Sequence, residues 1–194
     1  MEIYSLKEEY IQYLQKFDNR VCVSKLNQAF GRKYVGVVFQ INDVVYFAPL
    51  SSKQKERHFT DVLLFDNKSQ LGSVKINNMV PVPKKYKDQL ITPVIINEFL
   101  NSINEASKRY GNLLKKQQQV LFSTQVSSSI RNKATNFYIE YKNKPLLQKL
   151  CCDFKLLEQK ALEFSLDIFK DLNKEFKLEK KKEKSKELEE ELVR

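Results

Sequence analysis

Two apolar runs separated by only two residues constrain the fold of this chain more than any other feature. The runs are Tyr34–Ile41 and Val44–Leu50, and the pair Asn42-Asp43 lies between them. Asn and Asp tolerate a positive φ better than most residues with a side chain, so they favour a two-residue turn. The sequence therefore predicts a β-hairpin over residues 34–50.

Polar and basic residues gather at the ends of this hairpin. The second run leads into Ser51 and Ser52, while Arg32 and Lys33 precede the first run. Antiparallel pairing brings these two ends together, so we expect the four residues to lie close to one another. The following segment adds three cations and the only histidine, which are Lys53, Lys55, Arg57 and His58. Such a cluster can hold a phosphodiester and stabilise the charge of its transition state.

A second interpretation of this cluster is a basic loop that contacts phosphates without catalysis, and the residues alone favour neither one. His58 titrates near neutral pH, so it is a candidate acid or base, ranked below the serines and lysines. Phe30, in the polar segment before the hairpin, is the best candidate for stacking on an unpaired base. The strand aromatics Tyr34 and Tyr46 are predicted to be core residues.

The rest of the chain predicts an antiparallel sheet followed by helices. Further strands are expected at residues 61–65 and within 71–82, and an amphipathic helix at 6–17 follows a capping box formed by Ser5 and Glu8. Other helices are expected from Thr92 onward, over 130–141 behind a cap at residues 127–129, and from Asp153 to about residue 176. Strands first and helices later indicate an α+β fold.

Size and charge limit the domain organisation and the class of partner. The 194 residues predict one domain over residues 1–176 and a charged helical or disordered tail over 177–194. The net charge is +10, and residues 174–194 hold eight Lys/Arg and seven Asp/Glu, so residues 1–173 carry +9. A body this basic favours a polyanionic partner. With no membrane-spanning apolar run and no signal peptide, a cytoplasmic location is expected.

Several common catalytic sites are excluded by their missing motifs. The sequence has no P-loop, no Rossmann glycine pattern, no HExxH motif and no GxSxG nucleophile elbow. Its three cysteines and one histidine lack the spacing of a zinc site, and its four glycines disfavour a nucleotide cofactor. We expect no metal and no cofactor.

Five segments in order resemble one protein family over roughly residues 1–165. They are IYSLKEEYIQYLQKFD near the N-terminus, VGVV in the first hairpin strand, YFAPLSS at the end of the second, LGSVKINNMVPV over residues 71–82, and CDFKLLEQK over 152–160. The ordered set resembles the endoribonuclease toxins of type III toxin–antitoxin systems, the ToxN/AbiQ-like family. The charged tail lies outside the resemblance.

The resemblance implies a compact, strongly twisted antiparallel sheet surrounded by helices, similar to the barrel-like fold of Kid/MazF-type toxins. It implies a metal-independent enzyme that cleaves single-stranded RNA, leaving a 2′,3′-cyclic phosphate and a 5′-hydroxyl. It also implies a small repeated pseudoknot RNA antitoxin, which the toxin processes and which inhibits the toxin in a closed, trimeric toxin–RNA assembly. The substrates would be cellular or phage mRNAs, and the outcome abortive infection.

The same resemblance assigns catalytic roles to residues of the hairpin. The family's Thr/Ser-Ser pair falls on Ser51 and Ser52. Its basic residue before the first hairpin strand falls on Arg32, or on Lys33 if the loop contains a gap. The aromatic residue of the preceding loop falls nearest to Phe30.

The catalytic lysine has two candidates. The family usually continues Ser-Pro-Lys, whereas this chain has Lys53-Gln54-Lys55. Lys55 is preferred and Lys53 is retained, while Phe30, Lys33, Arg57 and His58 are expected to bind RNA. The leading prediction is thus an endoribonuclease toxin. The alternatives are a non-catalytic RNA-binding module and a protein-interaction domain that recruits a partner through its tail.

Overall fold

A seven-stranded antiparallel sheet organises the residues that the computed structural model describes, which are 1–24, 30–52, 59–67, 69–165, 168, 170–172, 174 and 178. The strands are β1 (Glu2–Leu6), β2 (Lys33–Ile41), β3 (Val44–Ser51), β4 (Asp61–Asp66), β5 (Ser69–Lys75), β6 (Val80–Pro83) and β7 (Ile91–Pro93). The chain divides into two compact units, residues 1–162 and 163–194, and the sheet belongs to the first. The predicted tail after residue 176 falls almost entirely outside the described residues and stays a prediction.

The predicted hairpin is confirmed as β2 and β3. Ile41 pairs with Val44, so only Asn42 and Asp43 form the turn, and Asn42 has a φ of 48°. The turn is also held from outside, because the backbone N–H of Lys84 donates to the Asp43 carbonyl at 2.8 Å. The local turn chemistry sets the register from Ile41 to Phe39, and an irregularity between Val35 and Phe39 then shifts the pairing, so that Val35 lies opposite Ala48.

The free edge of β3 is shared by two strands that are consecutive in the chain. Residues Val44–Phe47 pair with β6, and Leu50 and Ser51 pair with β5. A short 3₁₀ turn, η1 (Ile76–Asn78), separates β5 from β6, so the single stretch predicted over residues 71–82 is interrupted. The break lets β5 leave β3 and continue the sheet through β4.

The sheet is open, which corrects the barrel-like expectation. Its order is β4-β5-β3-β2-β1-β7, with β6 beside β3, and within the described residues no pairing joins β4 to β7. The terminal strand β7 has three residues and ends in Pro93, which has no N–H to offer a further strand. The α+β class and the antiparallel sheet are confirmed, while closure into a barrel is wrong.

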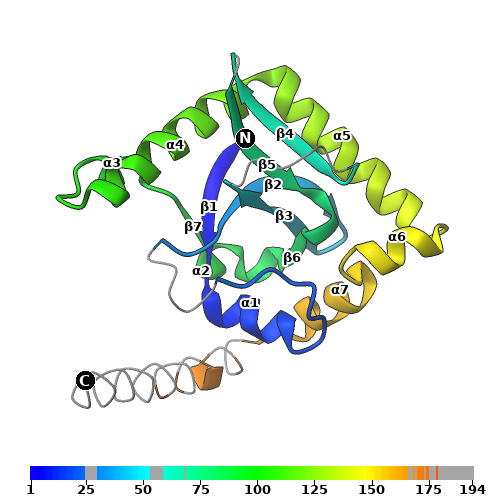
Figure 1. Cartoon of the computed structure of the whole chain (residues 1–194). Helices are drawn as coiled ribbons and strands as arrows, with labels where there is room; N and C mark the ends of the chain where they lie inside the picture. Colours follow the sequence, from blue (N-terminus) through cyan, green and yellow to red (C-terminus); the bar gives the residue numbers. More distant parts are fainter. Residues whose placement is uncertain are drawn as a thin grey trace, which may run out of the picture. The chain divides into compact units, whose positions relative to one another are not determined.

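Helices cover the sheet in Figure 1, where α4 lies along β4, β5 and β1 and α5 packs on β2. The α-helices of the described part are α1 (Glu8–Gln15), α2 (Lys87–Leu90), α3 (Ile96–Leu100), α4 (Glu105–Phe122), α5 (Thr124–Tyr141), α6 (Pro145–Leu150) and α7 (Phe154–Glu163), with a 3₁₀ turn η2 (Lys84–Tyr86) before α2. None of these helices combines the length and the apolar character that a membrane crossing requires.

Three predicted helix starts are wrong, although the helices themselves are present. Thr92 lies in β7, because its backbone pairs with Ser5 of β1 and sheet pairing overrides the local capping signal. Since Ser5 is in a strand, α1 instead begins after Lys7 and has no side-chain cap. Helix α5 begins at Thr124, ahead of the cap predicted at Ser127.

Buried tyrosines join the hairpin to the last helix of the unit. The hydroxyls of Tyr46 and Tyr138 both donate to Glu158 Oε1, at 2.7 and 2.6 Å. Burial raises the pKa of Tyr46 well above its usual value, so the hydroxyl stays a donor. Tyr34 and Tyr46 are fully buried, which confirms them as core residues. These contacts anchor β3, the strand that ends at Ser51, to α7.

Candidate active site

The hairpin register brings the predicted site residues on both of its strands to one end. Tyr34 of β2 pairs with Pro49 of β3, so Arg32, two residues before Tyr34, and Ser51, two residues after Pro49, lie at the same end. The register therefore brings Arg32, the residue before β2, to the end of the hairpin where Ser51 ends β3, as the sequence predicted for their proximity.

Ser51 lies in the middle of the sheet rather than at its edge. Its strand, β3, lies between β5 and β2; the pairing with β2 reaches Pro49, and Ser51 itself pairs with Ser73 of β5. Ser51 is partly buried, whereas Ser52, the next residue, is exposed. The Ser51 carbonyl also meets Gly72, where an added Cβ would lie 2.0 Å from the oxygen. Close contact between two backbones thus fixes the position of Ser51.

Arg32 and Lys33 have different surroundings. The backbone N–H of Arg32 donates to Ser24 Oγ at 2.7 Å, while the buried Arg32 Nε has no hydrogen-bond partner among the described residues. Lys33 is only 8% exposed, and its ammonium donates to the Phe30 carbonyl. Burial lowers the pKa of Lys33, and the carboxylate of Glu8 opposes that effect. A buried guanidinium nitrogen without a partner is a donor ready for an anionic ligand.

Phe30 belongs to an aromatic cluster that the sequence did not reveal. Its ring stacks on Tyr110 at 4.8 Å between centroids and meets Phe99 edge-on at 6.0 Å. The Lys33 ammonium lies 5.7 Å from the Phe99 centroid. Burial raises the pKa of Tyr110, and Arg32 opposes that rise. Phe99 belongs to α3 and Tyr110 to α4, so their rings reach Phe30 only through tertiary packing.

Lys53, Lys55, Arg57 and His58 lie outside the described residues. Their roles, and the choice between the two lysines, therefore stay predictions.

The strand β4, which follows residues 53–58 in the chain, is firmly held at its first residue, Asp61. Its side chain accepts from Ser73 Oγ and Lys75 Nζ, each at 3.3 Å, and its carbonyl accepts from Lys133 Nζ at 2.6 Å.

Removing the Asp61 carboxylate is expected to destabilise this edge of the sheet. Asp61 is 5% exposed, and its loss would leave Ser73 and Lys75 without their buried acceptor. We expect Asp61→Ala to lower the free energy of unfolding by about 3 kcal/mol in urea denaturation. Asp66→Ala, at the other end of β4, removes only a 3.7 Å pair with the exposed Lys116 and should cost less than about 1 kcal/mol. Equal losses in the two variants would contradict the role of Asp61.

The described residues offer hydroxyls and cations rather than metal ligands. No group of three or more His, Cys, Asp or Glu side chains in this part of the chain is arranged to hold a metal ion. The three cysteines are free, and burial raises the pKa of the Cys151 thiol to about 12. The chemistry that the site can perform is phosphate binding, charge stabilisation and proton transfer.

Comparison with known proteins decides the family. The family model described as toxin ToxN of the type III toxin–antitoxin system matches residues 2–162. The chain belongs to the ToxN family. This confirms the predicted family resemblance, and the match covers nearly all of the first compact unit.

The curated ToxN-family relatives are endoribonucleases. Endoribonuclease ToxN of Bacillus thuringiensis subsp. kurstaki is 33% identical over 84% of each chain. Endoribonuclease AbiQ of Lactococcus lactis subsp. lactis is 31% identical over 85% of this chain and 90% of AbiQ. Endoribonuclease ToxN of Pectobacterium atrosepticum is 28% identical over 85% of this chain and 94% of the relative. The predicted enzyme class is thereby confirmed.

Solved structures of ToxN-family proteins share the fold. One, described as showing selective toxin inhibition by a non-coding RNA pseudoknot, has a TM-score of 0.70 at 31% identity and covers 84% of this chain and 96% of its own. AbiQ, described as a lactococcal anti-phage endoribonuclease of the type III system, has a TM-score of 0.66 at 29% identity and covers 83% and 95%.

Proposed function

We propose that this ToxN-family chain is a metal-independent endoribonuclease toxin that cleaves single-stranded RNA to 2′,3′-cyclic phosphate and 5′-hydroxyl ends. The observation that carries the proposal is the meeting of Ser51 and Arg32 at one end of the β2–β3 hairpin. In this reaction the RNA supplies its own nucleophile, the 2′-hydroxyl. The protein then has to bind the phosphate, stabilise its charge and move two protons.

The proposed reaction is a transesterification within the RNA. The 2′-oxygen attacks the adjacent phosphorus, the bond from phosphorus to the 5′-oxygen breaks, and the 2′-hydroxyl loses its proton while the leaving oxygen gains one. Ser51 binds the scissile phosphate or passes on the 2′-hydroxyl proton, and Ser52 orients the phosphate. Arg32 stabilises the charge of the phosphorane. Its buried Nε has no hydrogen-bond partner among the described residues, which favours Arg32 over Lys33 for this role.

The remaining roles rest on the sequence. Lys55, or Lys53, shares the charge stabilisation with Arg32, and Arg57 and His58 contact the RNA backbone. Phe30 stacks on an unpaired base, and its ring is already aligned by Tyr110. The Lys33 ammonium donates to the carbonyl of Phe30 and thereby helps to position the ring that stacks on the base.

We also propose the partners that the family suggests. A small repeated pseudoknot RNA inhibits the toxin, is processed by it, and joins it in a closed trimeric assembly. The charge of +9 on residues 1–173 favours such a polyanion. Cellular or phage mRNAs are the substrates in abortive infection. A cytoplasmic location and a relationship to the Kid/MazF fold remain predictions.

One assay tests the reaction. We expect the purified protein to cleave single-stranded RNA in the presence of a chelator, with cyclic phosphate and 5′-hydroxyl ends identified by kinase labelling and mass spectrometry. Intact RNA under conditions of tight binding would instead indicate a non-catalytic RNA-binding module. Cleavage that requires added metal, or that leaves 5′-phosphate ends, would contradict the proposed mechanism.

A further inference from the structure

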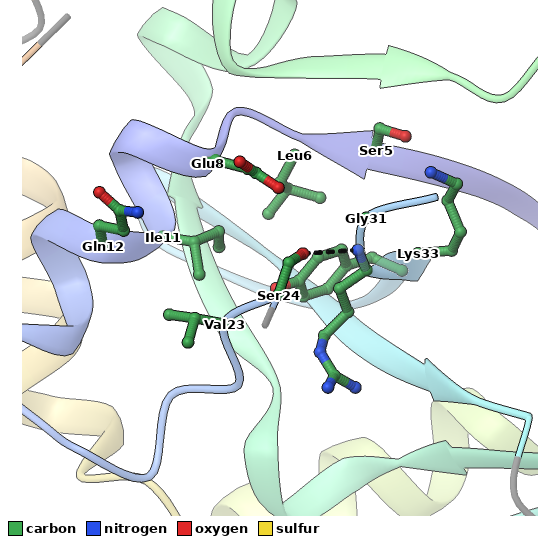
Figure 2. A pocket seen from close by; sticks show the side chains of 11 residues that line it. Ser5, Leu6, Glu8, Ile11, Gln12, Val23, Ser24, Gly31 and Lys33 are labelled. Carbon is green, nitrogen blue, oxygen red and sulfur yellow. Dashed lines mark hydrogen bonds between the residues drawn. The ribbon is translucent and has the colours of Figure 1, made fainter. Parts of the chain in front are cut away.

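A cavity with a mixed polar and apolar lining lies beside the proposed active site, between α1 and the segment that leads into β2. Its volume is about 180 Å³. Figure 2 shows Glu8 and Gln12 on the helix side, with Ser24 and Gly31 on the opposite side. The residues that line it and can form hydrogen bonds through their side chains are Ser5, Glu8, Gln12, Ser24, Arg32, Lys33 and Tyr34. We call this space the α1 cavity.

Three polar groups of the α1 cavity lie close together around Gly31. A Cβ placed on Gly31 would lie 3.6 Å from Glu8 Oε1, 3.8 Å from Ser24 Oγ and 3.9 Å from Lys33 Nζ. A carboxylate acceptor, a hydroxyl and a cationic donor therefore surround one small space. Gly31 has a φ of 56°, which favours glycine, and the absent side chain keeps this space open.

The α1 cavity also adjoins the group proposed to contact the scissile phosphate. Arg32 lines the cavity and carries a buried Nε without a partner among the described residues. The strand register puts Arg32 at the Ser51 end of the hairpin. A nucleotide whose phosphate lay between Arg32 and Ser51 would thus have its base within reach of the cavity.

We propose that the α1 cavity binds one unpaired nucleobase next to the scissile phosphate and selects a base with an exocyclic amine, which is adenine, guanine or cytosine. The inference rests on the proposed RNA cleavage and adds a specificity site to it. Glu8 accepts the hydrogen bond from the amine, because an ionised carboxylate can only accept. Gln12 contacts a neighbouring position of the same base edge, and apolar contact comes from the walls formed by Leu6, Ile11 and Val23.

The carboxylate makes the α1 cavity selective. Uracil has no exocyclic amine, and its single ring N–H is flanked by two carbonyl oxygens that the Glu8 carboxylate would repel. A bare phosphate would be repelled by the same group. Protein sites read unpaired bases through hydrogen bonds of this type on the exposed base edges. Single-stranded RNA is therefore the ligand that the mixture of charges in the cavity fits.

The test measures base preference rather than activity alone. The wild type, Glu8→Gln and Glu9→Gln are each assayed for cleavage of a set of RNA oligonucleotides. These oligonucleotides differ only in the nucleotide on either side of the cleavage site. At one of these two positions we expect the wild type to cleave the uracil substrate at least about tenfold more slowly than the amine-bearing ones. We expect Glu8→Gln to lose most of this discrimination, because an amide can also donate to a uracil carbonyl.

Glu9→Gln is the matched control. It removes the other acidic side chain of the first turn of α1, so both variants lose the same favourable interaction with the helix N-terminus. Glu9 does not line the α1 cavity, and its variant should keep the wild-type preference. Should Glu8→Gln fail to fold, Gln12→Ala at the cavity wall tests the same discrimination.

A binding measurement separates this inference from the proposed function. The Ser51→Ala protein is titrated with the same oligonucleotides, and we expect the uracil substrate to bind most weakly at the same position. If the protein binds RNA with this preference but never cleaves it, the proposed reaction is wrong and the base site stands. If the base preferences of wild type and Glu8→Gln are equal in both cleavage and binding, the α1 cavity is not the base site.

Discussion

Ser51→Ala is expected to lower the rate of RNA cleavage by about 10²–10⁴-fold, the range typical for loss of a positioned proton-transfer or charge-stabilising group. Ser51 ends β3 at the end of the hairpin where Arg32 precedes β2, and its hydroxyl is the group proposed to bind the scissile phosphate or to pass on the 2′-hydroxyl proton. The fold should survive, because no described contact of the core depends on this hydroxyl. Single-turnover cleavage in chelator, with circular dichroism of both proteins, measures the effect.

Two further variants refine this result. Ser51→Thr keeps the hydroxyl and should retain most of the activity. Ser69→Ala removes a hydroxyl from the exposed start of β5 and should leave the rate unchanged. Wild-type cleavage by Ser51→Ala, together with unchanged toxicity in cells, would remove Ser51 from the mechanism and leave Ser52 and the lysines as candidates.

The hairpin and part of its site were predictable because they depend on local rules. A two-residue turn starts the antiparallel pairing, and the register beyond the irregularity between Val35 and Phe39 brings Arg32 to the end of the hairpin where Ser51 lies. Amphipathic spacing likewise predicted α1, whose buried residues include Tyr10 and Leu14. Each of these features is determined within about 30 residues of sequence.

Features that depend on distant pairing were not predictable. Thr92 carries a helix-capping signal, yet it joins the sheet by pairing with Ser5 of β1, far earlier in the sequence. Tyr110 stacks on Phe30 only because α4 packs beside β1. The open sheet depends on which strands lie at its two ends, and no local pattern records that choice.

The second large effect is expected at Gly72, a residue without any proposed chemical role. Gly72 has a φ of 130°, a conformation that residues with a side chain rarely adopt, and an added Cβ would lie 2.0 Å from the Ser51 carbonyl oxygen. We expect Gly72→Ala to lower the free energy of unfolding by about 3 kcal/mol or more, through backbone strain and overpacking together. Urea denaturation measures the loss.

Gly72→Ala should also reduce cleavage in protein that is still folded. The obstacle is backbone rather than a flexible side chain, so the clash is relieved only if β5 moves away from β3. Ser73, the next residue, pairs directly with Ser51, and the displacement would therefore be transmitted to the catalytic strand end. Asp61→Ala provides the comparison, because it weakens β5 through side chains and leaves the contact between Gly72 and Ser51 intact.

The two variants are best compared at a temperature where both are more than nine-tenths folded. Activity per folded molecule should fall at least about tenfold in Gly72→Ala, since small misplacements of a reacting group are costly, and should stay near the wild-type value in Asp61→Ala. If Gly72→Ala were as stable and as active as the wild type, the close approach of β5 to Ser51 would not be what positions the serine. The rigidity of the site would then have to come from β2 and the buried tyrosines behind β3.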